Sequence, residues 1–199
     1  ISRLIELGTP LPEVAKPVAA YVPAVVTGNL VFTSGQLPFI NGVLPATGKV
    51  GGTIDPSDAK GFAQQCALNA LAAVKTAIGD LDRIKRIVKV VGFVASVPEF
   101  TGQPAVINGA SEFLGQVFGD AGVHARSAVG VPVLPLDSPV EVEIIAEFEK
   151  TIDAEPTFTE ATIRYARLIS ESSADRAIST SSAPSPLTLP ANSSSRAGA

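Results

Sequence analysis

The sequence predicts a sheet of the α+β or α/β class with helices packed on one face. Three observations lead to this: strict apolar–charged alternation at 140–148, a β-branched run at 86–96, and two stretches with helical spacing before and after that run. Apolar residues make up 46% of the 199 residues, which is enough to build a core. The expected order is strand, strand, helix, strand, helix, strand, strand.

The first clear strand and the first helix are marked by turn and capping residues. Residues 30–34 are β-branched or aromatic and lie between glycine turns, which is typical of a strand. A helix is expected to begin at Asp55-Pro56, because aspartate caps a helix and proline is favoured in the first turn, and to end at Gly79. Its buried stripe reads Phe62, Cys66, Ala70, Ala73 and Ala77, so Cys66 is interpreted as a packed small hydrophobe rather than a nucleophile.

The next strand and the second helix are indicated by residue composition and by proline and glycine at their ends. The Ile- and Val-rich run 86–96 predicts a long strand that Pro98 stops. A second helix is expected from Pro104 to Gly119, with inward residues Ile107, Ala110, Phe113, Leu114 and Val117. Gly109 weakens such a helix by roughly 1 kcal/mol relative to alanine, so either a close packing contact or a ligand is expected beside it.

The last strand carries the clearest periodicity. Residues 140–148 place apolar side chains on one face and three glutamates on the other. The preceding run 126–134, joined to it through 135–139, predicts a hairpin-like pair. Because both helices are expected on one face of the sheet, the other face is either exposed to water or covered by another chain.

Composition changes near residue 150. Residues 151–199 hold ten serines against seven in residues 1–150. We therefore predict a domain at 1–150 and a low-complexity C-terminal extension at 151–199 that is largely disordered. One short amphipathic helix is predicted through Phe158, Ala161, Tyr165 and Leu168.

Charge and residue counts exclude several classes of function. A formal net charge of −4 disfavours a nucleic-acid partner. No apolar run reaches the length of a membrane span, and residues 1–4 do not open a secretory signal, so no membrane partner is expected. The single cysteine fits a reducing, cytoplasmic compartment. With one cysteine and one histidine, His124, a zinc site would need carboxylates, and we predict neither metal nor cofactor.

Most chemical motifs are absent, and one arginine remains. The glycines at 42–49 lack the spacing of a phosphate loop, and without a nucleophile elbow a catalytic triad through His124 is disfavoured. Arg126 lies at the mouth of a predicted strand beside the strand of glutamates, where a guanidinium could bind the carboxylate of a small acid and a glutamate could activate water. The alternative is a surface Arg126–Glu ion pair, worth at most about 1 kcal/mol.

Several separated motifs resemble one known family. They are 28–38 (GNLVFTSGQLP), Ala125-Arg126-Ser127, Leu134-Pro135 and Val140-Glu141-Val142-Glu143. Over about 21–148 the chain resembles the Rid family of reactive intermediate (enamine/imine) deaminases, also called YjgF-like and formerly endoribonuclease L-PSP. The resemblance implies an α+β, chorismate-mutase-like fold, with a mixed sheet and two helices on one face, assembled as a homotrimer with sites between subunits.

The resemblance also implies roles for residues. Arg126 would hold the substrate carboxylate together with the main-chain N–H of Ala128, and Glu141 would position the attacking water. The same cleft would be lined by Tyr21, Ser34, Gly35 and Asn108. Many family members carry cysteine where this chain has Ala128, which changes the pocket. His124 is interpreted as a local hydrogen-bonding residue rather than a catalytic one.

The implied activity is hydrolysis of reactive 2-imino or enamine acids of the 2-aminoacrylate type to 2-oxoacids and ammonia, a form of metabolite damage control. The ligand is therefore a small carboxylate-bearing imine or a 2-oxoacid. Two alternatives stay open: a non-catalytic sensor of small carboxylates, and a ribonuclease or translation inhibitor. The acidic composition weighs against the ribonuclease.

Overall fold

The order of strands and helices agrees with the prediction from β1 onward, whereas the short N-terminal helix α1 was not predicted. The computed structural model describes residues 2–14 and 20–150. After a short helix α1 (Ser2–Glu6), the chain forms β1 (Ala24–Thr27), β2 (Leu30–Thr33), α2 (Pro56–Ile78), β3 (Ile84–Ala95), α3 (Gln103–Phe118), β4 (Ala125–Val131) and β5 (Val140–Phe148). Three short 3₁₀ turns are η1 (Leu81–Arg83), η2 (Gly119–Gly122) and η3 (Pro135–Asp137). The extension 151–199 and its predicted helix lie outside the described residues.

The predicted hairpin-like pairing of the last two strands is wrong. The sheet order is β1-β2-β5-β3-β4, so β5 lies between β2 and β3, and β4 pairs only with β3, in parallel. The segment 132–139 is longer than a tight hairpin turn, and Leu136 and Asp137 in it adopt positive φ. This segment carries the chain past the end of β3, and β5 then gains a strand neighbour on each side.

Helix α2 forms where its capping residues predict. The Asp55 side chain accepts a hydrogen bond from the Ser57 backbone N–H at 2.8 Å, and Gly79 ends the helix at φ 87°. Cys66, Ala70 and Ala73 of the predicted stripe are fully buried or nearly so. Burial, and secondarily the Glu141 carboxylate, raise the pKa of the Cys66 thiol well above its ordinary value. The interpretation of Cys66 as a packed residue is confirmed.

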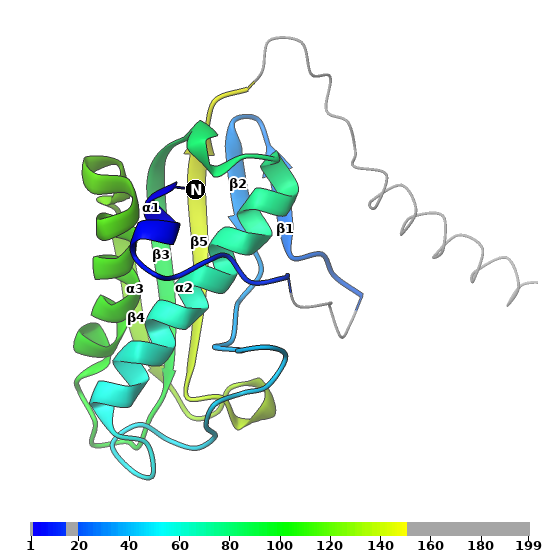
Figure 1. Cartoon of the computed structure of the whole chain (residues 1–199). Coiled ribbons are helices and arrows are strands. Elements are labelled where there is room, and N and C mark those ends of the chain that lie inside the picture. Colours follow the sequence, from blue (N-terminus) through cyan, green and yellow to red (C-terminus); the bar gives the residue numbers. More distant parts are fainter. Residues whose placement is uncertain (1, 15–19, 151–199) are drawn as a thin grey trace, which may run out of the picture. The chain divides into compact units, whose positions relative to one another are not determined.

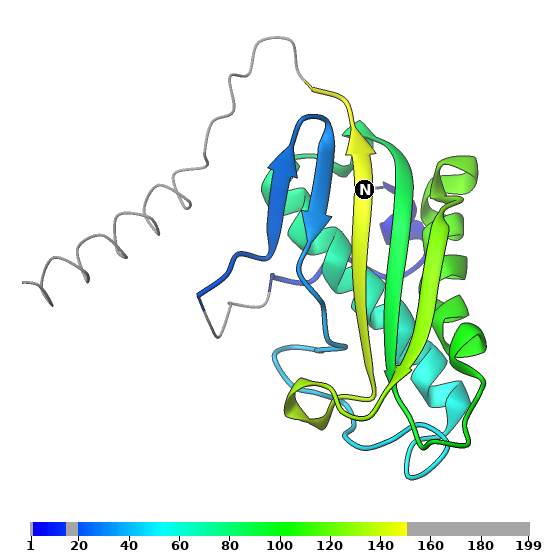
Figure 2. The same cartoon turned by 180° about the vertical axis from the view of Figure 1, so that it is seen from behind.

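Both long helices cover the same face of the sheet, as Figure 1 shows, and Figure 2 shows the other face as strands alone. The apolar residues of β5 face the helices and are buried, whereas the residues between them, starting with Glu141 and Glu143, point to the other side. We call the first side the helix face and the second the open face. Within 2–14 and 20–150, no helix has the length and hydrophobicity needed to cross a lipid bilayer.

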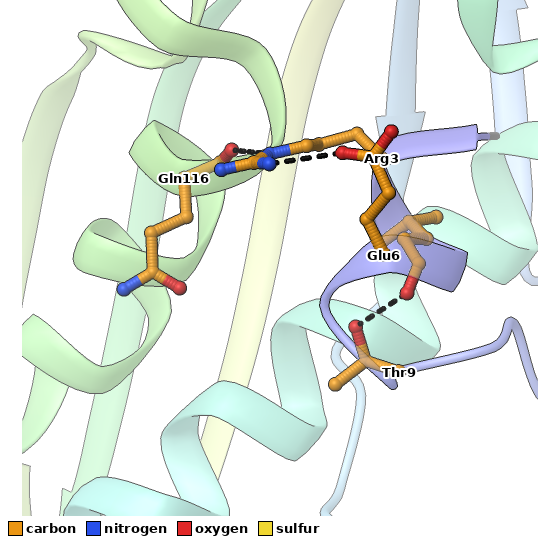
Figure 3. A network of polar contacts seen from close by, with 5 residues as sticks. Arg3, Glu6, Thr9 and Gln116 are labelled. Atoms are coloured by element: carbon orange, nitrogen blue, oxygen red, sulfur yellow. Dashed lines mark hydrogen bonds and ion pairs between the residues drawn. The ribbon is translucent and has the colours of Figure 1, made fainter.

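The short helix α1 is held against α3. Leu4 is buried, and the Arg3 Nε donates a hydrogen bond to the backbone carbonyl of Gln116 at 3.1 Å. Arg3 also pairs with Glu6 at 3.0 Å, and the Thr9 hydroxyl donates to the Leu4 carbonyl (Figure 3). The N-terminal segment is thus attached to the end of α3 that is remote from Asn108 in the sequence.

Gly109 is explained by close helix packing and not by a ligand. A Cβ at position 109 would lie 1.9 Å from the backbone carbonyl oxygen of Lys60 in α2. This contact brings α3 close to α2 and keeps the N-terminal half of α3, with Asn108 next to the glycine, in a defined position.

We expect Gly109→Ala to lower the free energy of unfolding by about 1–3 kcal/mol, because the two helix backbones must separate. Gly115→Ala, on the same helix, is the matched control: a Cβ there meets nothing within 4 Å. The control should leave stability unchanged or raise it by up to about 1 kcal/mol. Urea unfolding followed by circular dichroism measures both, and equal effects at the two positions would contradict the packing explanation.

Candidate functional site

Arg126 lies on the edge strand β4 and faces the helices. In the sheet register it aligns with Val90 of β3, which aligns with Ile144 of β5, and both are buried on the helix face. The half-buried guanidinium reaches α3, where its Nη1 donates to the Asn108 Oδ1 at 2.8 Å and to the Ser111 Oγ at 3.2 Å. Asn108 and Ser111 are three residues apart, so they share one side of the helix.

The guanidinium of Arg126 has no acidic partner in the part of the chain that the structure describes. The alternative of an Arg126–Glu surface pair is therefore wrong. Both acceptors on α3 are neutral, so they orient the guanidinium without compensating its charge. An oriented, half-buried cation of this kind can bind a carboxylate through charge-assisted hydrogen bonds.

His124 belongs to the same polar cluster. Its Nε2 lies 2.9 Å from the Ser111 Oγ, and its Nδ1 lies 2.6 Å from the Gly122 carbonyl oxygen. The predicted local hydrogen bonds of His124 are confirmed. Ser111 is not among the residues predicted from the sequence, although its position one helical turn after Asn108 could have indicated it.

Glu141 belongs to a second group, on the open face. It aligns with Phe93 of β3, and its carboxylate lies directly over Gly35: a Cβ on residue 35 would be 1.7 Å from the Glu141 Oε1. Burial, and secondarily the neighbouring Glu143 carboxylate, raise the pKa of Glu141. A carboxyl group with a raised pKa is suited to accept a proton near neutral pH.

Gly35 is held beside Glu141 by backbone hydrogen bonds. Gln36 and Val142 exchange two such bonds, of 2.9 and 3.0 Å, so residues 34–36 continue the ladder next to β5. The Ser34 hydroxyl donates to the Val22 carbonyl at 2.7 Å, which holds the segment that contains Tyr21. Tyr21 is 43% exposed. The predicted site residues Ser34, Gly35 and Glu141 therefore lie close together, and Tyr21 directly precedes the residue that Ser34 binds.

The two groups do not share a cleft within one chain. Ala128 aligns with Gly92 and lies on the helix face with Arg126 and Asn108. The Glu141 group lies on the open face, and β3 separates β5 from β4. The expectation that Arg126 stands beside the strand of glutamates is thus corrected: the two strands are not neighbours. No cluster of three or more His, Cys, Asp or Glu side chains that could hold a metal occurs within 2–14 and 20–150.

Comparison with protein families identifies the family of this chain. The model for YjgF/chorismate mutase-like proteins, which carries an endoribonuclease label, matches residues 1–148. Among curated proteins, TCP17 of Trypanosoma cruzi is 42% identical over 149 residues, which are 73% of this chain and 92% of that protein. The 2-iminobutanoate/2-iminopropanoate deaminase of Escherichia coli K12 is 36% identical over 132 residues, covering 65% of this chain and 88% of the enzyme.

Solved structures show the same fold. The Agrobacterium tumefaciens protein Atu1372, of unknown function, superposes with a TM-score of 0.69 at 48% identity, covering 74% of this chain and 91% of that one. The Escherichia coli protein TdcF, crystallised with bound serine, gives a TM-score of 0.50 at 28% identity. The match covers 69% of this chain and 94% of that one. These likenesses confirm the predicted mixed α+β, chorismate-mutase-like fold and the family resemblance.

Proposed function

Because the chain belongs to the YjgF/chorismate mutase-like family, we propose that it hydrolyses reactive 2-imino acids to 2-oxoacids and ammonia. The observation that carries the proposal is the guanidinium of Arg126, which is oriented by two neutral acceptors and has no acidic partner within the described ranges. A similar protein is named a 2-iminobutanoate/2-iminopropanoate deaminase, and another was crystallised with serine, an amino acid that carries a carboxylate.

A complete site requires two copies of the chain. Arg126 and Ala128 of one copy lie on the helix face, where Arg126 contacts Asn108 of α3, whereas Gly35 and Glu141 lie on the open face, with Ser34 and the segment of Tyr21 next to them. We propose a homotrimer in which the first group of one subunit meets the second group of its neighbour. The open face supports this, since it exposes apolar side chains that another chain could cover: Val25 by 54%, Phe32 by 37% and Val129 by 44%.

The chemistry then follows from the two groups. Arg126 binds the carboxylate of the 2-imino acid and directs the C2 carbon toward a water held by Glu141. Glu141 accepts a proton from this water as its oxygen attacks C2, and returns the proton to the nitrogen, which forms a carbinolamine. The hydroxyl proton then moves to the amine as the C–N bond breaks, and a 2-oxoacid and ammonia leave. A net reaction of imine and water to ketone and ammonia needs no redox partner.

The Ala128 side chain changes the pocket beside the anchor. It lies two residues after Arg126 on the same face of β4 and packs partly against the core. Its side chain ends at Cβ, so it supplies no thiol to the site. We propose that the main-chain N–H of Ala128 supports the bound carboxylate and that catalysis uses only the carboxyl group of Glu141.

A coupled assay that generates 2-aminoacrylate in situ tests the proposed deaminase activity. A pyridoxal-phosphate-dependent dehydratase releases the enamine from serine, and the purified chain is added at increasing concentration. The proposal predicts a faster disappearance of the enamine and imine in proportion to added protein. A rate equal to that of the reaction without this protein would leave only the binding of small carboxylates, the function of a sensor.

A further inference from the structure

We infer that His124 and Ser111 are positioning residues, which act through a one-directional chain of hydrogen bonds to fix how Arg126 presents its guanidinium to the ligand. The inference rests on the proposed function and concerns the anchor of that same site. The chain runs from Arg126 on β4 to Ser111 on α3, then to His124 before β4, and ends at a backbone carbonyl in η2.

The direction of each hydrogen bond follows from the chemistry of the groups. A carbonyl oxygen can only accept, so the contact of 2.6 Å between His124 Nδ1 and the Gly122 oxygen places the hydrogen on Nδ1. In the neutral imidazole the Nε2 is then an acceptor, and the Ser111 hydroxyl must donate to it across 2.9 Å. The hydroxyl oxygen keeps its lone pairs for Arg126, which can only donate.

These hydrogen bonds determine which edge of the guanidinium is left for the ligand. Nη1 carries two hydrogens, and its two acceptors are the Asn108 Oδ1 and the Ser111 Oγ. With both hydrogens of Nη1 engaged on α3, the donors left for a ligand are those of Nε and Nη2. These two nitrogens point in parallel and match the two oxygens of a carboxylate.

The hydrogen-bond chain ends at Gly122, in a rigid part of the structure. Gly122 is buried, and a Cβ on it would lie 2.4 Å from the Leu114 carbonyl oxygen of α3, so η2 packs tightly on the helix that also carries Ser111. Because the acceptor carbonyl and the serine are attached to one packed unit, the imidazole between them holds the serine hydroxyl in a single orientation. Without the imidazole, the hydroxyl can rotate and donate elsewhere, and Arg126 loses a fixed acceptor.

The expected consequence is a weaker and less well oriented ligand. His124→Ala removes the acceptor of the Ser111 hydroxyl, and Ser111→Ala removes one of the two acceptors of the Arg126 Nη1. Each should raise the dissociation constant for 2-oxobutanoate, and the KM for the imine, about fivefold, the effect of one lost hydrogen bond. The kcat should change less, by about twofold or below, because Glu141 lies in the other group.

Conservative variants separate positioning from simple packing. His124→Gln keeps an acceptor near the place of Nε2, and Ser111→Thr keeps the hydroxyl, so both should bind 2-oxobutanoate within about twofold of the wild type. Glu112→Ala is the matched control on α3, because Glu112 forms only an exposed ion pair with Lys60. It should leave both affinity and turnover unchanged.

A spectroscopic readout needs no ligand. The chain has one histidine, so the ¹⁵N spectrum of the imidazole is assigned without ambiguity. We expect the Nδ1–H form of His124 in the full-length protein, and a shift of the Nε2 resonance in Ser111→Ala as its donor disappears. The Nε2–H form, or an Nε2 resonance that Ser111→Ala leaves in place, would overturn the inference.

The two proposals fail in different ways. Wild-type protein that shows the expected imidazole spectrum but neither binds 2-oxobutanoate nor consumes the imine contradicts the proposed function and leaves the hydrogen-bond chain in place. Wild-type protein that is active, while His124→Ala and His124→Gln bind 2-oxobutanoate equally well, contradicts the positioning role alone.

Discussion

Arg126→Ala is expected to weaken the binding of 2-oxobutanoate, and to lower kcat/KM for the imine, by about 100-fold or more. The variant removes two charge-assisted hydrogen bonds to the carboxylate, each worth about 1.5–3 kcal/mol. Neither Asn108 nor Ser111 can replace the charge, because both are neutral. Isothermal titration with 2-oxobutanoate and the coupled imine assay measure the two effects.

Two further arginine variants sharpen this result. Arg126→Lys keeps the charge but loses the planar pair of donors, so its affinity should fall between those of the wild type and the alanine variant. Arg86→Ala removes an exposed guanidinium from β3 and serves as the control for net charge. If Arg86→Ala and Arg126→Ala lowered affinity equally, the effect would come from general electrostatics, and Arg126 would not be the anchor.

Glu141→Gln should abolish most turnover while keeping the ligand. The amide cannot accept a proton from water, so kcat is expected to fall by about 100-fold or more, the usual contribution of a general base. Binding of 2-oxobutanoate should stay within about threefold, because the anchor belongs to the other group of residues. A variant that keeps wild-type turnover would exclude Glu141 as the base.

The pH dependence of turnover gives the same residue a second test. Burial and the Glu143 carboxylate both raise the pKa of Glu141, and only the deprotonated form can act as a base. The turnover rate should therefore increase with pH, and the pH at which it reaches half of its maximum should lie above the ordinary glutamate pKa. Glu143→Gln should move this half-maximal pH to a lower value, because it removes a neighbouring negative charge that raises the pKa of Glu141. Glu147→Gln, farther along β5, is the control.

The types of the elements were predictable because their signals are local. The Asp55 cap, the proline at 56 and the glycine at 79 each act within one helical turn, and α2 spans Pro56–Ile78 as they indicate. The alternation at 140–148 places apolar side chains on one face of any sheet, and the burial of β5 follows it residue by residue. None of these signals depends on which strands are neighbours.

Strand neighbours depend on long-range packing, and there the prediction was wrong. The period of two in β5 fits an edge or a central strand equally well, and residues 135–139 resembled a turn. The sequence did hold a contrary signal: β3, α3 and β4 form a strand–helix–strand unit, which usually places its two strands in parallel as neighbours. With β4 placed next to β3, β5 pairs with the other side of β3.

The site was partly predictable for the same reason. Arg126 and Glu141 could be identified from their motifs, but their placement on opposite faces depends on the register of three strands. The contact of Glu141 with Gly35 spans more than a hundred residues of sequence and has no local signal. Ser111 could be placed on the Asn108 side of α3 only once a helix there was accepted and Arg126 was known to face it.

We propose that Arg126 of one subunit works with Glu141 of another, and mixing two inactive variants tests this pairing. Arg126→Ala and Glu141→Gln chains are unfolded together, refolded in equal amounts and compared with each variant refolded alone. A site shared between subunits of a cyclic trimer predicts that activity returns to about one quarter of the wild-type value, because random assembly pairs an intact arginine with an intact glutamate at one interface in four. Mixed trimers, verified by native mass spectrometry, that stay as inactive as the separate variants would contradict the claim.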